Sequence, residues 1–163
     1  MKEIKNFLEE KEFLKLQEAV CNSFFPWFRN DGVVFTDDPF IQFTHTFYKE
    51  GTIHSTYFGI IEPLLKKINP FCLLRAKLNL ITKTNKIIEH GMHVDVQNKK
   101  FNKKITTAIY YINTNNGYTK FINNEKIKSE ENKFVSFNST LKHTGTSCTN
   151  KNYRIVLNLN YFK

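Results

Sequence analysis

The sequence changes character at Pro70, and this change limits the folds that the chain can adopt. Before Pro70, apolar residues recur at helical spacing in two segments, 3–25 and 54–69. After it, strand-like segments follow one another without a helical segment between them. Such an order favours an antiparallel barrel or a double-sheet jelly roll. The predicted strands are 71–81, 90–96, 104–112, 117–122, 133–137, 140–147 and 152–162.

The first 70 residues are predicted to form two helices and one strand. Pro26 ends the helix over 3–25, and Pro63 lies inside the helix over 54–69. Proline inside a helical pattern either kinks the helix or begins a new one, so both alternatives stay open. The segment 39–48 alternates apolar and polar residues, so we predict a strand there and place it at a sheet edge.

Composition narrows the class of protein. The 24 basic and 15 acidic residues give a formal net charge of +9, which suits nucleic acid or small anionic ligands as partners. Most lysines are spread along the chain and are interpreted as a solvated surface. The cluster Lys99, Lys100, Lys103 and Lys104 is either a site for an acidic partner or a simple mobile loop.

The cysteines and the apolar segments bear on location. Cys21, Cys72 and Cys148 form no CxxC pair, which argues against a disulfide framework or a zinc knuckle and fits a reducing cytoplasm. The first residues do not resemble a signal peptide. No segment approaches the roughly 20 apolar residues of a membrane span, so we expect a cytoplasmic protein without a membrane partner.

A candidate metal site begins in the stretch HGMHVDVQNKK with His93 and Asp95. On a strand, residues two apart face the same side, so this imidazole and this carboxylate would aim at one point. The alternative is a surface histidine beside a solvated carboxylate. His143 follows 50 residues after His93. Two histidines and one carboxylate leave three positions of an octahedral ion open, as in the facial triad of non-haem Fe(II) oxygenases.

Arg154 follows His143 by 11 residues, on the polar face of the predicted strand 152–162. A guanidinium can bind a planar carboxylate with two parallel hydrogen bonds. Taken alone, Arg154 would be interpreted as part of a surface salt bridge. Asn79 lies on the polar face of the strand 71–81. It either points into a pocket and touches cosubstrate or substrate, or it belongs to a solvated face.

With these residues, the C-terminal half resembles the Fe(II)- and 2-oxoglutarate-dependent dioxygenases, most closely the prolyl-4-hydroxylase-like branch. The matching segments are HVD (93–95), TAIYYIN (107–113), Gly117, FVSFN (134–138), His143 and YRIVLNLNYF (153–162). One departure is Asn-Asn-Gly where relatives often carry a Gly-Gly pair, which leaves the substrate open.

The resemblance implies a mainly β fold: a double-stranded β-helix, a jelly-roll or cupin-like barrel, packed against two N-terminal helices. We expect one domain over 1–163, in which 1–70 supports the barrel and 71–163 forms the catalytic core. The resemblance also implies that His93, Asp95 and His143 hold Fe(II). Arg154 and Tyr111 would then bind the distal carboxylate of 2-oxoglutarate, with Asn79 as a further contact. Dioxygen is the second cosubstrate, and ascorbate is a candidate addition.

The implied reaction hydroxylates an unactivated C–H bond and releases succinate and CO₂. A protein or peptide side chain is the favoured substrate, with proline the leading candidate. One alternative is an oxidative nucleic-acid demethylase, although RIVLNLN lacks the second arginine usual in that branch. A small-molecule hydroxylase acting on a free amino acid is another. A non-enzymatic cupin-like metal binder is disfavoured, because a bare metal site needs no carboxylate anchor such as Arg154 with Tyr111.

Overall fold

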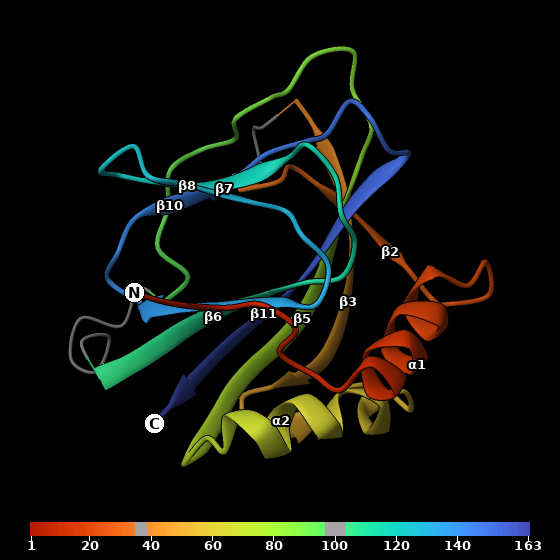
Figure 1. Ribbon diagram of the computed structural model, residues 1–163, viewed down its shortest axis with the longest axis vertical. Coiled ribbons are helices and arrows are strands. Elements are labelled where there is room, and N and C mark those ends of the chain that lie inside the picture. The colour runs from red at the N-terminus through yellow and green to blue at the C-terminus, as the bar shows by residue number, and fades with distance from the viewer. Residues whose placement is uncertain (35–38, 97–103) are drawn as a thin grey trace.

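The computed structural model describes residues 1–34, 39–96 and 104–163 and is dominated by β-strands (Figure 1). Within these described residues, two α-helices and one 3₁₀ helix, η1, lie in the N-terminal part of the chain. The elements are β1 (Lys2–Ile4), α1 (Glu10–Cys21), β2 (Phe28–Asp31), β3 (Ile41–Lys49), β4 (Thr52–Ile53), η1 (Phe58–Ile61), α2 (Glu62–Ile68), β5 (Cys72–Thr82), β6 (Ile105–Tyr111), β7 (Tyr118–Phe121), β8 (Lys126–Lys128), β9 (Lys133–Asn138), β10 (His143–Gly145) and β11 (Tyr153–Phe162).

The strands form two antiparallel sheets. The larger sheet has the order β1-β9-β6-β11-β5-β3-β2, with β4 paired to β3, and the smaller has the order β10-β7-β8. In Figure 1, α1 and α2 cover one face of the larger sheet, and the smaller sheet lies on the opposite side. This arrangement confirms the predicted class, a mainly β structure packed against two helices.

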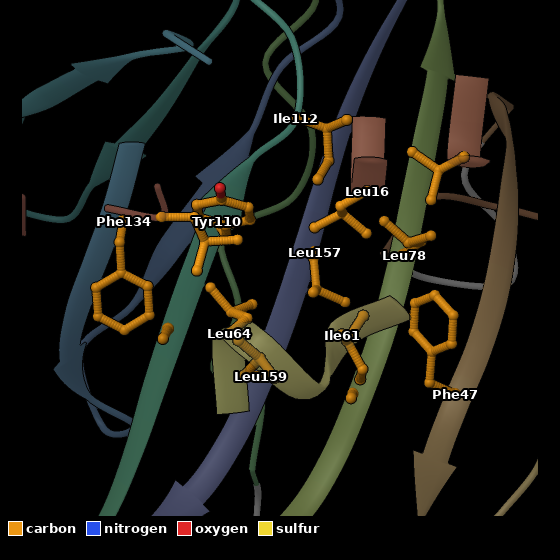
Figure 2. Packing of buried hydrophobic residues seen from close by; sticks show 14 of the residues in the cluster. Leu16, Phe47, Ile61, Leu64, Leu78, Tyr110, Ile112, Phe134, Leu157 and Leu159 are labelled. Atoms are coloured by element: carbon orange, nitrogen blue, oxygen red, sulfur yellow. The ribbon is translucent and has the colours of Figure 1, made fainter. Parts of the chain in front are cut away.

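The main hydrophobic core lies between the helices and the larger sheet. Leu16 of α1 and Leu64 of α2 pack with Leu78 of β5 and Leu157 of β11, and all four are fully buried (Figure 2). Burying a leucine side chain contributes about 1.5–3 kcal/mol. This core therefore holds the larger sheet in place and leaves its opposite face free to carry polar residues.

Each of the strands β5 and β11 has one face in the core and one face on a cavity. Their alternate apolar residues, such as Leu78 and Leu157, enter the core beneath the helices. The residues between them, such as Lys77, Asn79 and Asn158, line a cavity on the opposite face. Since successive strand residues point to opposite faces, one alternating pattern builds both the core and the cavity.

A smaller apolar cluster joins residues of the two sheets. Phe121 of β7 and Phe137 of β9 meet edge to face, with ring centroids 5.0 Å apart. Tyr111 and Val156 from the larger sheet belong to the same cluster. This packing joins β7 to the larger sheet and positions the side chains that lie beside it.

The predicted helix over 3–25 is wrong at its start. Residues Lys2–Ile4 form β1, which pairs with β9, and α1 begins only at Glu10. Between them Asn6 has a φ of 49°, a left-handed value that interrupts a helix. Phe7 then donates its backbone N–H to the Asn132 carbonyl at 2.8 Å. The apolar spacing that resembled a helix instead serves contacts with a distant strand.

The predicted strand at 39–48 is present as β3, but its predicted place at a sheet edge is wrong. It lies between β5 and β2, so β2 ends the sheet on that side of the described chain. In the segment 54–69, the second alternative holds: η1 is followed by α2, with Pro63 in the first turn of α2. Asn69 ends α2 in a left-handed conformation, with φ 49°.

Two further differences concern short segments. The predicted strand over 90–96 is not a strand: within it only His93 forms a bridge, opposite His143, and a second bridge joins Glu89 to Thr146 just before it. Strand β8 (Lys126–Lys128) was not predicted, because three residues are too few to show a pattern. Among the described residues, no helix is long and apolar enough to cross a membrane.

Candidate metal centre and anion pocket

His93, Asp95 and His143 lie together and offer three ligand atoms within 4.8 Å of one another. The two histidines are directly paired: each backbone N–H donates to the carbonyl of the other, at 3.0 and 2.9 Å. Opposed residues of an antiparallel pair share a face, and the two rings accordingly lie 4.8 Å apart. A single backbone bridge thus places the two histidines side by side, without the predicted strand over 90–96.

The orientation of both imidazoles leaves the same nitrogen available. Nδ1 of His93 lies 3.0 Å from the Gly91 carbonyl, and Nδ1 of His143 lies 3.2 Å from the Leu141 carbonyl. A proton on each Nδ1 satisfies these carbonyls and leaves each Nε2 as a ligand. A backbone hydrogen bond of this kind commonly fixes the tautomer of metal-binding histidines.

Asp95 is held by two neighbours from the larger sheet. Its carboxylate lies 3.1 Å from Nη2 of Arg75 and accepts a hydrogen bond from the Asn160 amide at 3.3 Å. Burial works to raise the pKa of Asp95, but the interaction with His93 and the charge of Arg75 hold this pKa well below its usual range. The group is therefore a carboxylate at neutral pH, as a metal ligand must be.

The two histidines differ in their affinity for protons. Burial works to lower the pKa of His93, but the hydrogen bond with Asp95 outweighs it and raises this pKa above the ordinary value. Burial lowers the pKa of His143. Without a metal, the proton of the cluster therefore belongs to the His93–Asp95 pair, and a bound cation would displace it.

Arg154 at the start of β11 is buried, with 2% of its surface exposed. Its Nε donates to Ser129 at 2.7 Å and its Nη2 to Thr119 at 3.1 Å. No carboxylate among residues 1–34, 39–96 and 104–163 forms an ion pair with it, and burial lowers its pKa. A buried cation without a counter-ion is costly, so this site is suited to an anionic ligand.

Glycine makes room for this guanidinium. A Cβ at Gly117 would lie 2.7 Å from the Ser147 carbonyl and 2.8 Å from Cδ of Arg154, and a Cβ at Gly145 would lie 3.3 Å from Nη1. Side chains at these positions would displace Arg154 or the backbone beside it. The Asn-Asn-Gly sequence therefore keeps a glycine at 117, where the space beside the arginine requires one.

Tyr111 reaches Arg154 through a shared partner. Its hydroxyl donates to Thr119 Oγ1 at 2.8 Å, the same atom that accepts from Arg154. The guanidinium carbon lies 5.7 Å from the centre of the Tyr111 ring. Burial raises the pKa of Tyr111, so the phenol remains a donor. Tyr111, Thr119 and Arg154 thus form one hydrogen-bonded group, of which Thr119 and Arg154 line the cavity.

The metal cluster and Arg154 face one cavity of about 270 Å³. Asn79 also lines it, and its buried Oδ1 has no hydrogen-bond partner among the described residues. The structure therefore brings together all six residues that the sequence singled out: His93, Asp95, His143, Arg154, Tyr111 and Asn79.

Several further polar residues in or beside this cavity were not assigned a role from the sequence, among them Gln42, Thr119 and Asn158. Arg75 and Lys77 line the cavity from β5, and Asn160 reaches Asp95 from β11. The sequence pattern that could have indicated Arg75, Lys77 and Asn160 is their alternation with core residues along β5 and β11. Of the predicted basic cluster Lys99–Lys104, residues 99–103 lie outside the described residues, and Lys104 is exposed.

Comparison of the sequence with protein-family models and with curated proteins finds no match. The structure, however, is similar to solved ones. It matches the viral collagen prolyl hydroxylase of Paramecium bursaria Chlorella virus-1, in its 2OG complex, over 99% of this chain and 95% of that one, with a TM-score of 0.61 and 14% identity. It matches a 2OG-Fe(II) oxygenase family oxidoreductase of Burkholderia pseudomallei over 96% and 82%, with a TM-score of 0.66 and 8% identity.

The chain has the fold of the 2OG–Fe(II) oxygenases. A third match is the Trichoplax adhaerens prolyl hydroxylase solved with a peptide fragment of hypoxia inducible factor, over 99% of this chain and 82% of that one. Its TM-score is 0.68 at 13% identity. The predicted double-stranded β-helix is therefore confirmed, and so is the resemblance to prolyl hydroxylases at the level of the fold.

Proposed function

We propose that this protein is an Fe(II)- and 2-oxoglutarate-dependent dioxygenase that hydroxylates an unactivated C–H bond. The observation that carries the proposal is one cavity with the His93–Asp95–His143 cluster and, apart from it, the buried guanidinium of Arg154. A metal site alone does not need a buried cation without a counter-ion. A dicarboxylate that bridges a metal and an arginine accounts for both features.

The donor set suits a divalent ion with open positions. Two Nε2 atoms and one carboxylate occupy three positions and leave the others to exogenous ligands. The ligand atoms lie within 4.8 Å of one another, and bonds of about 2.0–2.2 Å would draw them closer together when one ion binds. Asn160 donates to the Asp95 carboxylate and holds it in the cluster.

Arg154 and Tyr111 would bind the distal carboxylate of 2-oxoglutarate. Charge-assisted hydrogen bonds to a guanidinium are about twice as strong as neutral ones. Ser129 and Thr119 already fix the orientation of the guanidinium, so little side-chain entropy is lost on binding. Val156 of the smaller apolar cluster lines the same cavity, and Phe121 and Phe137 of that cluster pack against the ring of His143.

When bound, Fe(II) with 2-oxoglutarate and O₂ supplies the oxidising chemistry: the 2-oxo acid becomes succinate and CO₂, and one oxygen atom enters the C–H bond as a hydroxyl. The residues of this chain bind and orient the reactants. Within this reaction class we propose an amino-acid side chain as the target, proline first, because the similar structures include prolyl hydroxylases.

Formation of succinate from 2-oxoglutarate tests the proposal. Enzymes of this class decarboxylate the cosubstrate slowly without their substrate, so wild type with Fe(II) and ascorbate should form succinate. His93→Ala should abolish succinate formation. Arg154→Met should form succinate only at high 2-oxoglutarate concentration. Tyr110→Phe is the matched control, since the Tyr110 hydroxyl bonds Asn132 on the far face of the sheet. Equal succinate formation by wild type and His93→Ala would refute the proposal.

A further inference from the structure

The cavity contains a second cation besides Arg154 that lacks a counter-ion. Lys77 lies on the cavity face of β5, directly between Asn158 of β11 and Thr46 of β3. It is half-buried, and among the described residues its Nζ has no hydrogen bond or ion pair. Its neighbour Arg75 differs in this respect, because it is paired with Asp95.

The charges of the cavity do not balance once the cosubstrate is counted. Among its described lining residues, three cations (Arg75, Lys77 and Arg154) face one carboxylate, Asp95. Fe(II) and the 2-oxoglutarate dianion cancel each other's charge. The surplus of positive charge therefore remains in the complex, in the cavity that the metal cluster also lines.

The energetics of Lys77 point the same way. Burial and the nearby charge of Arg75 lower the pKa of Lys77 to about 8. An ammonium in this position is destabilised, and an anion beside it would relieve the cost. The geometry offers further partners, since the buried Oδ1 atoms of Asn79 and Asn158 lack hydrogen bonds. These oxygens can accept from N–H groups of a ligand whose carboxylate meets Lys77.

We propose that Lys77 forms an anion subsite, distinct from Arg154, that binds a carboxylate of the primary substrate. The substrate is then an amino acid, or a peptide with an acidic residue beside the oxidised carbon, and Asn79 and Asn158 accept hydrogen bonds from its N–H groups. This inference rests on the proposed function, because it assigns Arg154 to the cosubstrate and Lys77 to the substrate.

Calorimetric titration of acetate tests the subsite without knowledge of the substrate. The protein is kept anaerobic with Fe(II) and saturating 2-oxoglutarate, so that Arg154 is occupied. Acetate should bind wild type and the exposed-lysine control Lys83→Met equally, and Lys77→Met at least about tenfold more weakly. Lys77→Arg should retain binding, and neutral acetamide should not bind. Absence of acetate binding to wild type, or equal binding to Lys77→Met, would overturn the proposal.

A 2-oxoglutarate titration separates this inference from the proposed function. Lys77→Met should bind 2-oxoglutarate within about threefold of wild type. A loss of tenfold or more would assign Lys77 to the cosubstrate and refute the subsite. If wild type binds no 2-oxoglutarate with Fe(II), the proposed function fails. The acetate comparison is then made in an Arg154→Met background and still decides the role of Lys77.

Two probes distinguish the possible sources of the carboxylate. One is L-proline, compared with L-prolinamide, and the other is acetyl-prolyl-aspartyl amide, compared with its asparaginyl counterpart. Tighter binding of L-proline than of its amide assigns the subsite to the α-carboxylate of a free amino acid. Tighter binding of the aspartyl peptide assigns it to an acidic neighbour. Equal binding within both pairs would contradict the subsite.

Discussion

The guanidinium of Arg75 lies 3.1 Å from the carboxylate of Asp95, within the cluster that offers ligands to a metal. Arg75 is thus the counter-ion of this buried carboxylate when no metal is bound, and its charge opposes that of an incoming cation. The same contact stabilises the metal-free fold and weakens metal binding.

Replacing Arg75 by Met should separate these two effects. Breaking a buried ion pair costs about 3–5 kcal/mol, but the Arg75 side chain is 25% exposed, so we expect a loss of about 2 kcal/mol in the metal-free protein. Mn(II) should raise the melting temperature more in Arg75→Met than in wild type. Arg29→Met is the control, because Arg29 pairs with Asp31 on an exposed strand. An equal Mn(II) effect in both proteins would contradict this role.

Tyr111→Phe should weaken the binding of 2-oxoglutarate. The lost hydroxyl bonds Thr119, which also accepts from Arg154, and one such bond contributes about 0.5–1.5 kcal/mol. We expect the Michaelis constant for 2-oxoglutarate to rise by about two- to tenfold, measured by succinate formation. Tyr110→Phe, the adjacent change on the opposite face, should leave this constant unchanged. The same rise in both variants would show a general effect of packing.

Gly117→Ala should disturb the arginine site through space alone. The new methyl group would lie 2.7 Å from the Ser147 carbonyl and 2.8 Å from Cδ of Arg154. We expect a loss of about 1–3 kcal/mol in stability, as for an overpacked core position, together with weaker 2-oxoglutarate binding. Gly59→Ala is the matched control, since nothing lies within 4 Å of its Cβ position. Unchanged 2-oxoglutarate binding in Gly117→Ala would contradict the view that Gly117 makes room for Arg154.

The stability of Lys77→Met relative to wild type should depend on pH. The pKa of Lys77 is about 8 in the folded chain, against an ordinary value of 10.5 that applies to the unfolded chain. Between these two pH values the unfolded chain therefore binds more protons. Wild type therefore gains stability as pH rises from about 8 to 10.5, by on the order of 2 kcal/mol. Below pH 8 the variant should be the more stable protein, and its advantage should disappear by pH 10.5. Urea unfolding of both proteins near pH 8 and near pH 10.5 measures this difference in stability. A difference independent of pH would contradict the prediction.

The parts of the fold that the sequence predicts well are those with one apolar and one polar face. Strands β5 and β11 are half-buried between the core and the cavity, so Leu78 and Leu157 alternate with Lys77 and Asn158. This alternation also allowed the polar face of β5 to be predicted from the sequence. Its sequence did not show that Arg75 meets Asp95, because that contact joins segments 20 residues apart outside any regular strand pair.

The errors arise where distant residues decide local structure. Phe7 and Leu8 fit a helical stripe, but their backbone N–H groups bond Asn132, at the start of a strand that follows much later in the chain. His93 and Asp95 needed to share a face, which a strand would provide. Instead, a single bridge pairs His93 with His143, and contacts with Arg75 and Asn160 hold Asp95. Local periodicity contains no information about either partner.

The central claim is that one metal ion in the His93–Asp95–His143 cluster binds 2-oxoglutarate, and anaerobic absorption spectroscopy tests it most directly. Uncoupled turnover can be silent, whereas chelation of Fe(II) by a 2-oxo acid gives a visible metal-to-ligand charge-transfer band. We expect this band in wild type, saturating at one equivalent of Fe(II), and its loss in Asp95→Ala and His143→Ala. Failure of Fe(II) and 2-oxoglutarate together to produce the band in wild type, or an equal band in the ligand variants, would contradict the account.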